Sequence, residues 1–568
     1  MPARSPDRLL SQLEQARYQF GPDAAARVIK LLNSLGTTHF PDAASLIRFH
    51  EAVLFLRAFP QAPGVLRKTE RLLNDFCRRV GLLRRSGADM DAFDPLEVSG
   101  IAGTQMSDTL SFDLARWLLR HMPHKVAIDR EHWEDVRAMG LTMPRFLPLV
   151  EDDAFVEADT PWQRWLAAAS KNTNATFRWL IERFDRLPLS PQQKAELYDS
   201  LRIPLLWDLG NSRITRTRNW KTPARIFYHD APLISRSAVS LSRELAQQPP
   251  RFTKVLRAQG QTVIDAIREV MLVRYRELYG TTLGDPSSVV RADVGRGVVI
   301  HLWGLLPERR LPLRAYVAGF TLKNGVPINY IEAIGLCEWI EVGFNTFYTF
   351  RGGEAGWIYA QVLRCLCAHM GARCVSVYPY QLGKDNDEAI ESGAFWFYRK
   401  LGFRPGNREL VRLVESEERR IAAVSKYRTP ARTLRRLAAD HVFYELPGAA
   451  IGAWDRFSTR NIGLGVNRHM AENFGGDATH LRQASTRSVA RILGVDWTKW
   501  NDLERTAFEN FAPLLAMIPG LHSWMSAEKQ ALVRIIRAKS ARDEMQYLRL
   551  TQRHQPLRES LLRIGSCV

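Results

Sequence analysis

The dipeptide Asn324-Gly325 stands between two apolar runs and is the strongest local constraint on the fold. The run before it reads RAYVAGFTL, the run after it reads VPINYIEAIGL, and Lys323 completes the connection. Asn and Gly tolerate the positive φ angles of a tight turn, so this pattern is typical of a β-hairpin. Further strand-like runs lie on both sides, VVIHLWGLL and EWIEVGFNTFYTF. The sequence therefore predicts that sheet structure begins near Val298.

Helical periodicity dominates the remainder of the chain. Apolar residues recur at spacings of three and four in segments such as AARVIKLLNSLG and EKQALVRIIRAKSARDEMQYLRL. A chain of 568 residues is also too long for one hydrophobic core. We expect an α+β fold, with a central mixed sheet flanked by mainly helical regions. The expected divisions are a helical region at 1–90, a helical region with a basic loop at 91–222, an α/β domain at 223–415 and a C-terminal helical region at 416–568.

The net charge of the chain limits the classes of molecule that it could bind. The chain has 79 Lys and Arg against 60 Asp and Glu, a net charge of +19. Such an excess attracts anions, so the candidate partners are nucleic acid, anionic lipid, phosphate-bearing cofactors and acidic carrier proteins. The 6 cysteines lack CxxC spacing, which favours a reducing, cytoplasmic location without a metal site. No apolar run approaches the length of a transmembrane segment.

The segment ESGAFWFYRKLGF carries a spaced motif. Its members are Glu391, Ala394, Tyr398, Lys400, Gly402 and Phe403. Together with the preceding order of hairpin, strand, Arg-Gly turn, helix and strand, the motif resembles the Gcn5-related N-acetyltransferase (GNAT) fold, most strongly from Gly319 to Phe403. The family usually has Asn at the position of Glu391. The resemblance implies a GNAT-like acyltransferase domain at 223–415.

In that family, a glycine-rich loop before a helix binds the pyrophosphate of coenzyme A. The corresponding sequence here is RGGEAG. By resemblance the donor would bind at Arg351, Gly352, Gly353, Ala355 and Gly356. Glu354 stands where the family has glycine, and a carboxylate at a helix N-terminus would repel phosphate. Three outcomes remain open: Glu354 points away from the loop, the donor presents its phosphopantetheine differently, or no donor binds.

The resemblance also assigns catalytic roles. Tyr398 would be the acid that protonates the departing thiolate, and a glutamate would take the proton of the amine. The candidates for this base are Glu332, Glu338 and Glu341. In an extended strand Glu338 and Glu341 point to opposite faces, so at most one of them faces the substrate. Glu338 shares its face with apolar residues that would raise its pKa, which leaves Glu341 as the solvated one. A bulge in the strand would reverse this assignment.

A second candidate site is a basic loop that contains no acidic residue, LGNSRITRTRNWKTPARIFYH. Its cations are Arg213, Arg216, Arg218, Lys221 and Arg225. An exposed loop with several cations and one aromatic residue, Trp220, is a candidate for phosphate contacts with a substrate or partner.

Two functions follow from these patterns. The first is an acyltransferase that moves an acyl group from a thioester donor, acyl-coenzyme A or an acyl-carrier protein, to an amine. The related Fem-type ligases use aminoacyl-tRNA as donor, and a basic surface would suit tRNA equally well. The alternative is a non-catalytic GNAT-fold protein that contacts nucleic acid or a protein partner through basic helices.

Overall fold

The computed structural model describes residues 6–123, 125–133, 137–146, 162–170 and 175–566. These residues form an α+β structure that divides into two compact units. Unit 1 consists of Met1–Pro232, Ile264–Thr282 and Asn324–Pro327. Unit 2 consists of Leu233–Val263, Leu283–Lys323 and Ile328–Val568. The two regions expected at 1–90 and 91–222 therefore both lie in unit 1.

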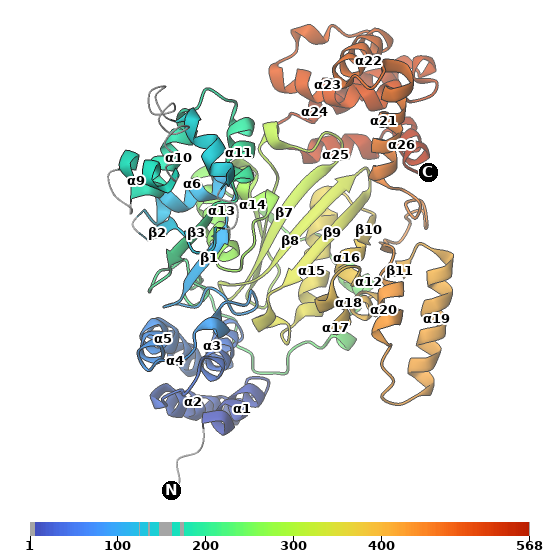
Figure 1. Cartoon of the computed structure of the whole chain (residues 1–568). Helices are drawn as coiled ribbons and strands as arrows, with labels where there is room; N and C mark the ends of the chain where they lie inside the picture. The colour runs from blue at the N-terminus through green and yellow to red at the C-terminus, as the bar shows by residue number, and fades with distance from the viewer. Residues whose placement is uncertain (1–5, 124, 134–136, 147–161, 171–174, 567–568) are drawn as a thin grey trace. The chain divides into compact units, whose positions relative to one another are not determined.

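Unit 1 begins with five helices that pack as a bundle (Figure 1). They are α1 (Pro6–Ala16), α2 (Pro22–Thr37), α3 (Ala43–Ala58), α4 (Pro63–Asn74) and α5 (Phe76–Arg85). Helix α3 contacts α1, α4 and α5, and it is apolar around most of its circumference. A helix of that composition must be covered on several sides, so α3 forms the centre of the bundle. Asp42 caps it by accepting a hydrogen bond from the Ser45 N–H.

A three-stranded antiparallel sheet with covering helices follows in unit 1. The strands are β1 (Gln105–Thr109), β2 (Val126–Ile128) and β3 (Pro204–Asp208), in the spatial order β1-β3-β2. The helices are α6 (Phe112–His121), α7 (Arg137–Thr142), α9 (Trp162–Ser170), α10 (Thr176–Arg186) and α11 (Pro191–Ser200). The core between them is largely aliphatic, and within it Phe112, Phe184 and Tyr198 meet in edge-on and tilted pairs.

The predicted Asn-Gly turn is confirmed, and its tip belongs to unit 1. Asn324 and Gly325 have φ angles of +48° and +79°. The Asn324 side chain donates to the carbonyl groups of Ala58 and Phe227, each at 2.9 Å, and accepts from the Phe227 N–H at 2.8 Å. The Arg57 guanidinium donates to the Asn324 carbonyl at 3.0 Å. The turn thus satisfies backbone groups of two distant segments of unit 1.

Unit 2 is built on a nine-stranded sheet to which the hairpin contributes two strands (Figure 1). The strands are β4 (Phe252–Lys254), β5 (Val290–Asp293), β6 (Val298–Trp303), β7 (Ala315–Lys323), β8 (Val326–Leu336), β9 (Trp339–Thr346), β10 (Cys374–Val377), β11 (Arg404–Pro405) and β12 (Val442–Glu445). Their spatial order is β11-β12-β10-β9-β8-β7-β6-β5-β4. The sheet is mixed, because β9 and β10 are parallel while their other neighbours, β8 and β12, pair with them in antiparallel fashion.

The parallel pair depends on helix α15 (Ala355–Met370), since parallel neighbours require a crossover connection. The helix lies against one face of the sheet, where Tyr359 contacts Phe344 of β9 (Figure 1). It ends at Gly371 with φ +69°, the left-handed conformation that glycine adopts readily at a helix C-terminus. The predicted order of strand, helix and strand is confirmed here.

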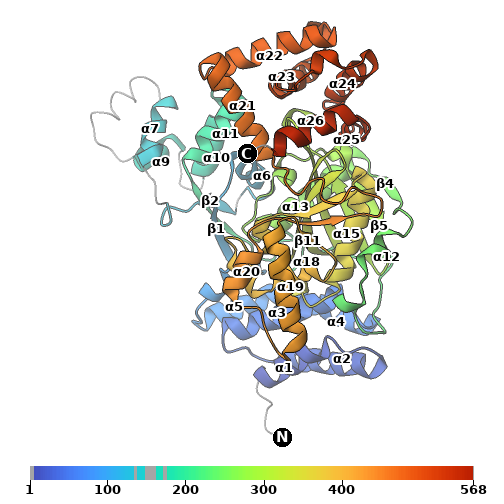
Figure 2. The same cartoon turned by 90° about the vertical axis from the view of Figure 1, so that its right-hand side faces the viewer.

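The remaining helices fall into those of the middle part of the chain and a C-terminal group. The former are α12 (Leu241–Leu245), α13 (Arg257–Leu272), α14 (Tyr279–Thr282), α16 (Pro379–Leu382), α17 (Asp387–Glu391), α18 (Ala394–Arg399), α19 (Arg408–Ala423) and α20 (Ala431–Leu437). The latter are α21 (Thr459–Phe474), α22 (Ala478–Leu493), α23 (Asp502–Ala516), α24 (Ser526–Ala538), α25 (Met545–Gln552) and α26 (Gln555–Ser566). Figure 2 shows this last group together, and α25 packs against α15 and β7.

Within the described ranges, no helix has both the length and the apolar character needed to cross a membrane.

Two glycines of unit 1, Gly325 in the turn and Gly87 after α5, offer a matched pair of substitutions. Gly325 and Gly87 have nearly equal φ angles, +79° and +77°, but a Cβ at Gly325 would lie 1.7 Å from the Lys221 carbonyl oxygen, whereas nothing lies within 4 Å of one at Gly87. We expect Gly87→Ala to cost about 1 kcal/mol from backbone strain alone. Gly325→Ala should cost about 3 kcal/mol or more, because backbone must move. Urea unfolding monitored by circular dichroism measures both, and equal losses would contradict the anchoring role of the turn.

Candidate active site

The candidate site lies where β9 and β10 diverge. These strands pair at Glu341 and Ser376, and their described pairing stops there. Further along β9, the N–H of Phe344 donates to the side chain of Gln381, at 3.3 Å. The Gln381 side chain therefore occupies the place of a neighbouring strand beside this part of β9.

Two of the three predicted glutamates share one face of the sheet. The register of β8 and β9 places Glu332 opposite Gly343 and Ile334 opposite Glu341. Since alternate residues of a strand point to the same face, Glu332 and Glu341 are diagonal neighbours on that face. The Glu332 carboxylate accepts a hydrogen bond from the Tyr316 hydroxyl.

Glu341 is paired with a histidine instead of being solvated. His441, just before β12, lies with Nε2 at 2.9 Å from Glu341 and Nδ1 at 3.5 Å from Asp440. The side chains of His441 and Glu341 are only 27% and 18% exposed. Burial alone would lower the pKa of His441, but its hydrogen bonds to Asp440 and Glu341 outweigh this and raise the pKa to about 9. With this pKa the histidine is a cation at neutral pH, and it forms an ion pair with Glu341.

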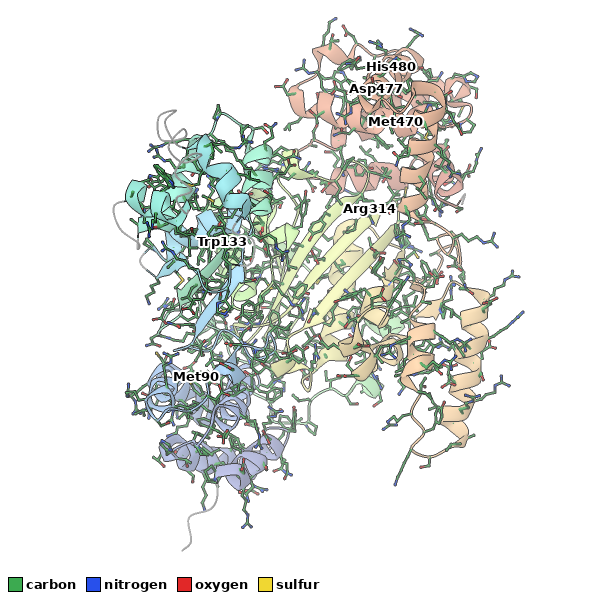
Figure 3. All side chains as sticks on the ribbon, in the orientation of Figure 1. Met90, Trp133, Arg314, Met470, Asp477 and His480 are labelled. Carbon is green, nitrogen blue, oxygen red and sulfur yellow. The ribbon has the colours of Figure 1, made fainter. Side chains whose placement is uncertain are left out.

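Arg314 adds a second positive charge on this face. It immediately precedes β7 and is labelled in Figure 3. Burial lowers its pKa, while the nearby charge of Glu341 opposes that shift. Glu341 therefore lies near two cations, Arg314 and His441.

Tyr398 reaches the same region through Gln381. Its hydroxyl donates to the Gln381 side-chain oxygen at 3.2 Å, and the Nε2 of Gln381 lies beside Gly343, opposite Glu332. Burial raises the pKa of Tyr398 well above its ordinary value. A phenol in this state remains protonated, so Tyr398 is better suited to donate a hydrogen bond than to release its proton.

Glu338 does not have the environment expected from the sequence. It lies in the turn between β8 and β9, not within a strand, because the turn residue Cys337 has φ +51°. Its carboxylate accepts hydrogen bonds from Arg558 Nε at 2.8 Å and from Trp454 at 2.9 Å. Burial would raise its pKa, but these two donors lower it. The expected apolar surround is therefore replaced by an ion pair, which favours a structural role.

Glu354 turns into the protein at the start of α15. Its side chain is 0% exposed, as is that of Lys323, whose Nζ lies 3.6 Å away. Arg296 also forms an ion pair with it, and the Ile234 N–H donates to it at 3.2 Å. Burial would raise the pKa of Glu354, but the bond from Arg296 and the charge of Lys323 lower it. Burial in turn lowers the pKa of Lys323 to about 7, against the opposing effect of Glu354. The Glu354 side chain is thus directed away from the loop, while the mode of donor binding stays a prediction.

The N-terminus of α15 is consequently free of a capping carboxylate and lies among cations. Glu354 is the N-cap residue, yet its side chain makes no capping hydrogen bond. A Cβ at Gly356 would lie 3.3 Å from the side chain of Arg236. Burial, followed by the charges of Arg236 and Arg428, lowers the pKa of Lys400. Three cations from separate segments thus lie close together near a helix N-terminus, which attracts anions.

Arg351 has a partner of its own. Its guanidinium forms an ion pair with Glu388 and stacks over the Tyr348 ring, 3.7 Å from the ring centre. The Gly353 N–H donates to the Phe350 carbonyl at 2.9 Å, which closes the turn that leads into α15. Of the predicted loop residues, Gly356 is the one adjacent to the cation cluster.

The basic loop divides into exposed and buried cations. Arg213, Arg218 and Lys221 line one surface hollow of about 420 Å³ in unit 1. Arg216, in contrast, is buried, donates to the carbonyl groups of Glu97 and Leu96, and lies 3.6 Å from Glu51. Burial lowers its pKa despite these partners. The expectation that Arg216 belongs to an exposed patch is wrong. Arg225 is exposed but does not line the hollow.

Sequence reasoning missed several residues of the candidate site, among them Gln381, Asp440 and His441. The segment DHVFYE contains a histidine directly before an apolar strand, which is a usable signal for a side chain at a sheet edge. Gln381 has no such signal, because only the divergence of β9 and β10 makes its position important.

No protein-family model, curated protein or solved structure matches the chain.

The ion pair of His441 and Glu341 predicts a pH dependence. The folded-state pKa of His441 is raised to about 9, so the stability it contributes is complete below the unfolded pKa of about 6.5 and is lost as pH rises through about 9. In Glu341→Gln, the midpoint of the His441 titration should fall by a unit or more, as measured by NMR of its ring protons. Glu332→Gln is the matched control and should leave that midpoint in place. An unchanged midpoint in Glu341→Gln would contradict the pairing.

Two glutamates near the start of α15 test the buried charge cluster. Glu354→Ala leaves Lys323 buried without this carboxylate, and we expect a loss of about 3 kcal/mol in the free energy of unfolding. Glu388→Ala removes a half-exposed partner of Arg351 and should cost less than about 1 kcal/mol. Urea unfolding of unit 2 compares the two variants. Similar losses would show that the buried ion pairs of Glu354 contribute no more to the free energy of unfolding than the half-exposed pair of Glu388.

Proposed function

We propose that unit 2 is an N-acyltransferase that moves an acyl group from a phosphopantetheine thioester, acyl-coenzyme A or an acyl-carrier protein, to an amine. The observation that carries the proposal is the inward turn of Glu354. Because Arg296 and Lys323 neutralise this carboxylate inside the protein, the phosphate-attracting start of α15 is retained. The GNAT-like order of strands and the motif around Tyr398 support the same function.

The donor phosphates would bind near the N-terminus of α15. The helix supplies backbone N–H groups and the positive end of its dipole, and Arg236, Lys400 and Arg428 supply full charges. In the described residues, none of these three side chains has an ion pair with a carboxylate. An acyl-coenzyme A with several phosphates, or the single phosphodiester of a carrier protein, would neutralise this cluster.

Glu341 is the best-placed base. Its carboxylate pairs with the protonated His441 and lies on the face that also carries Glu332. The amine nitrogen attacks the thioester carbonyl, forms the C–N bond and transfers its proton to Glu341. The C–S bond then breaks, and the sulfur leaves with the bonding electrons. Glu341 returns the proton to solvent, from which the released thiolate regains one, so the products are an amide and a thiol.

Tyr398 would stabilise the sulfur as it departs. Because burial raises its pKa, the phenol stays protonated and acts as a hydrogen-bond donor to the developing thiolate. This role differs from that of an acid that gives up its proton. The hydroxyl would have to exchange its present acceptor, Gln381, for the donor sulfur.

The position of Gln381 favours a second candidate, a GNAT-fold protein without catalytic activity. Its side-chain oxygen accepts from both Phe344 and Tyr398 at the point where the strands diverge. In this arrangement the thioester has no access to Tyr398, and the fold would serve for binding alone.

Thermal stabilisation distinguishes the two functions, since a ligand that binds only the native state raises the melting temperature. We expect acetyl-coenzyme A, a long-chain acyl-coenzyme A or an acyl-carrier protein to raise it. The double variant Arg236→Ala/Lys400→Ala should abolish that shift, whereas Arg412→Ala/Arg419→Ala, which removes the same charge from α19, should not. No shift with any donor would overturn the acyltransferase proposal.

Turnover of the thioester tests the catalytic roles. Glu341→Gln should lower kcat by about 100-fold or more through loss of the base. Tyr398→Phe should lower kcat by about 10- to 100-fold and leave donor stabilisation intact. The measurement is thiol release with a panel of amines. Activity unchanged in both variants would contradict the assigned roles.

A further inference from the structure

The basic hollow of unit 1 has the composition of a phosphate-binding site. It measures about 420 Å³ and is lined by Asn74, Arg213, Arg218, Trp220, Lys221 and Thr222. This volume lies within the range of ligand-binding pockets. The lining includes three cations, one aromatic ring and no carboxylate, which is an uncommon balance for a surface where cations are usually interspersed with acids.

The three cations have no direct ion pair among the described residues. Within the part of the chain that the structure describes, Arg213, Arg218 and Lys221 form no ion pair with Asp or Glu, although Arg218 donates to the Asn211 carbonyl at 2.9 Å. Glu70 is paired with Arg57 at 2.9 Å and lies 3.5 Å from the Thr222 hydroxyl. The charge of Lys221 acts on Glu269, whose pKa is raised overall by burial. The like charges therefore repel one another, and an anion in the hollow would relieve that repulsion.

The lining is held in place by the hairpin tip. The Lys221 N–H donates to the Gly325 carbonyl at 3.2 Å, and the Trp220 indole donates to the Thr217 carbonyl at 2.9 Å. The Arg57 guanidinium lies 4.4 Å from the centre of the Trp220 ring, so it supports the indole at the edge of the hollow. Cations on an anchored backbone lose less conformational freedom on binding than cations on a free loop.

Further cations lie close to Arg218. Arg84, Lys125 and Arg218 are all near enough to Cys77 to lower its pKa, although burial and the charge of Asp208 raise it overall. Asp208 is the one acid of that group, and its side chain accepts from the Gly210 N–H at 3.0 Å. The positive surface thus extends past the hollow, which suits a ligand with several phosphates in a row.

We propose that this surface binds a single-stranded nucleic acid, with phosphates at Arg213, Arg218 and Lys221 and one base against Trp220. Each cation displaces condensed counterions from the strand, and the indole offers a stacking surface that tolerates any base. The site is independent of the acyltransferase proposed for unit 2.

The test uses the full-length protein and a fluorescein-labelled 15-nucleotide oligouridylate, followed by anisotropy at several salt concentrations. Arg213→Ala/Arg218→Ala/Lys221→Ala should weaken binding by about 10-fold or more. It should also reduce the slope of log K against log salt by about 2, because each lost contact accounts for roughly 0.7. Arg408→Ala/Arg412→Ala/Arg419→Ala removes three exposed charges from α19 and should change the affinity less than about 3-fold.

Two further measurements complete the test. Arg213→Glu/Lys221→Glu alters only exposed side chains, and it should abolish binding while the circular dichroism and melting temperature stay as in the unmodified protein. Adenosine monophosphate and inorganic phosphate, tested by thermal shift, should bind far more weakly than the oligonucleotide. Equal loss of affinity in the hollow and α19 triple variants would overturn the proposal, as would stabilisation by a mononucleotide alone.

Discussion

The buried carboxylate of Glu354 determines how unit 2 is assembled around its candidate site. An ionised group with no exposure is tolerated only when cations and hydrogen-bond donors surround it. Lys323 supplies one cation from the end of β7, and Arg296 supplies another from the turn before β6. The start of α15 is therefore tied to two strands at once. If Glu354 were exposed, its carboxylate would oppose phosphate at the start of α15. Because it is buried, it instead holds in place a helix whose N-terminus attracts anions.

The candidate site gathers side chains that lie far apart in the sequence. Glu341 comes from β9, Gln381 from α16, Tyr398 from α18 and His441 from the residue before β12. Only the crossover through α15 and the return of β12 beside β10 bring these segments together. The resulting charges alternate in sign, because Glu341 lies near both Arg314 and His441.

Local sequence patterns predict helices, strands and turns better than they predict which side chains contact one another. The Asn324-Gly325 turn and the helix that ends at Gly371 follow from backbone preferences of single residues, which neighbours do not change. The environments of Glu338, Glu341 and Arg216 depend on contacts with residues that are distant in the sequence. These partners are Arg558, His441 and Glu97, respectively. Such pairings arise from tertiary contacts, so strand alternation alone placed Glu338 in an apolar surround that the fold does not provide.

The assignment of the hairpin tip to unit 1 also has a consequence for the order of synthesis. Unit 1 is discontinuous, and its last piece, Asn324–Pro327, leaves the ribosome long after residue 232. Until then the carbonyl of Ala58 and both backbone groups of Phe227 lack the Asn324 side chain that binds them. During translation, the N-terminal helices therefore lack these hydrogen bonds until Asn324, which directly follows strand β7, has been synthesised. A fragment that stops at residue 232 lacks Asn324, so these backbone groups of Ala58 and Phe227 would never receive its hydrogen bonds.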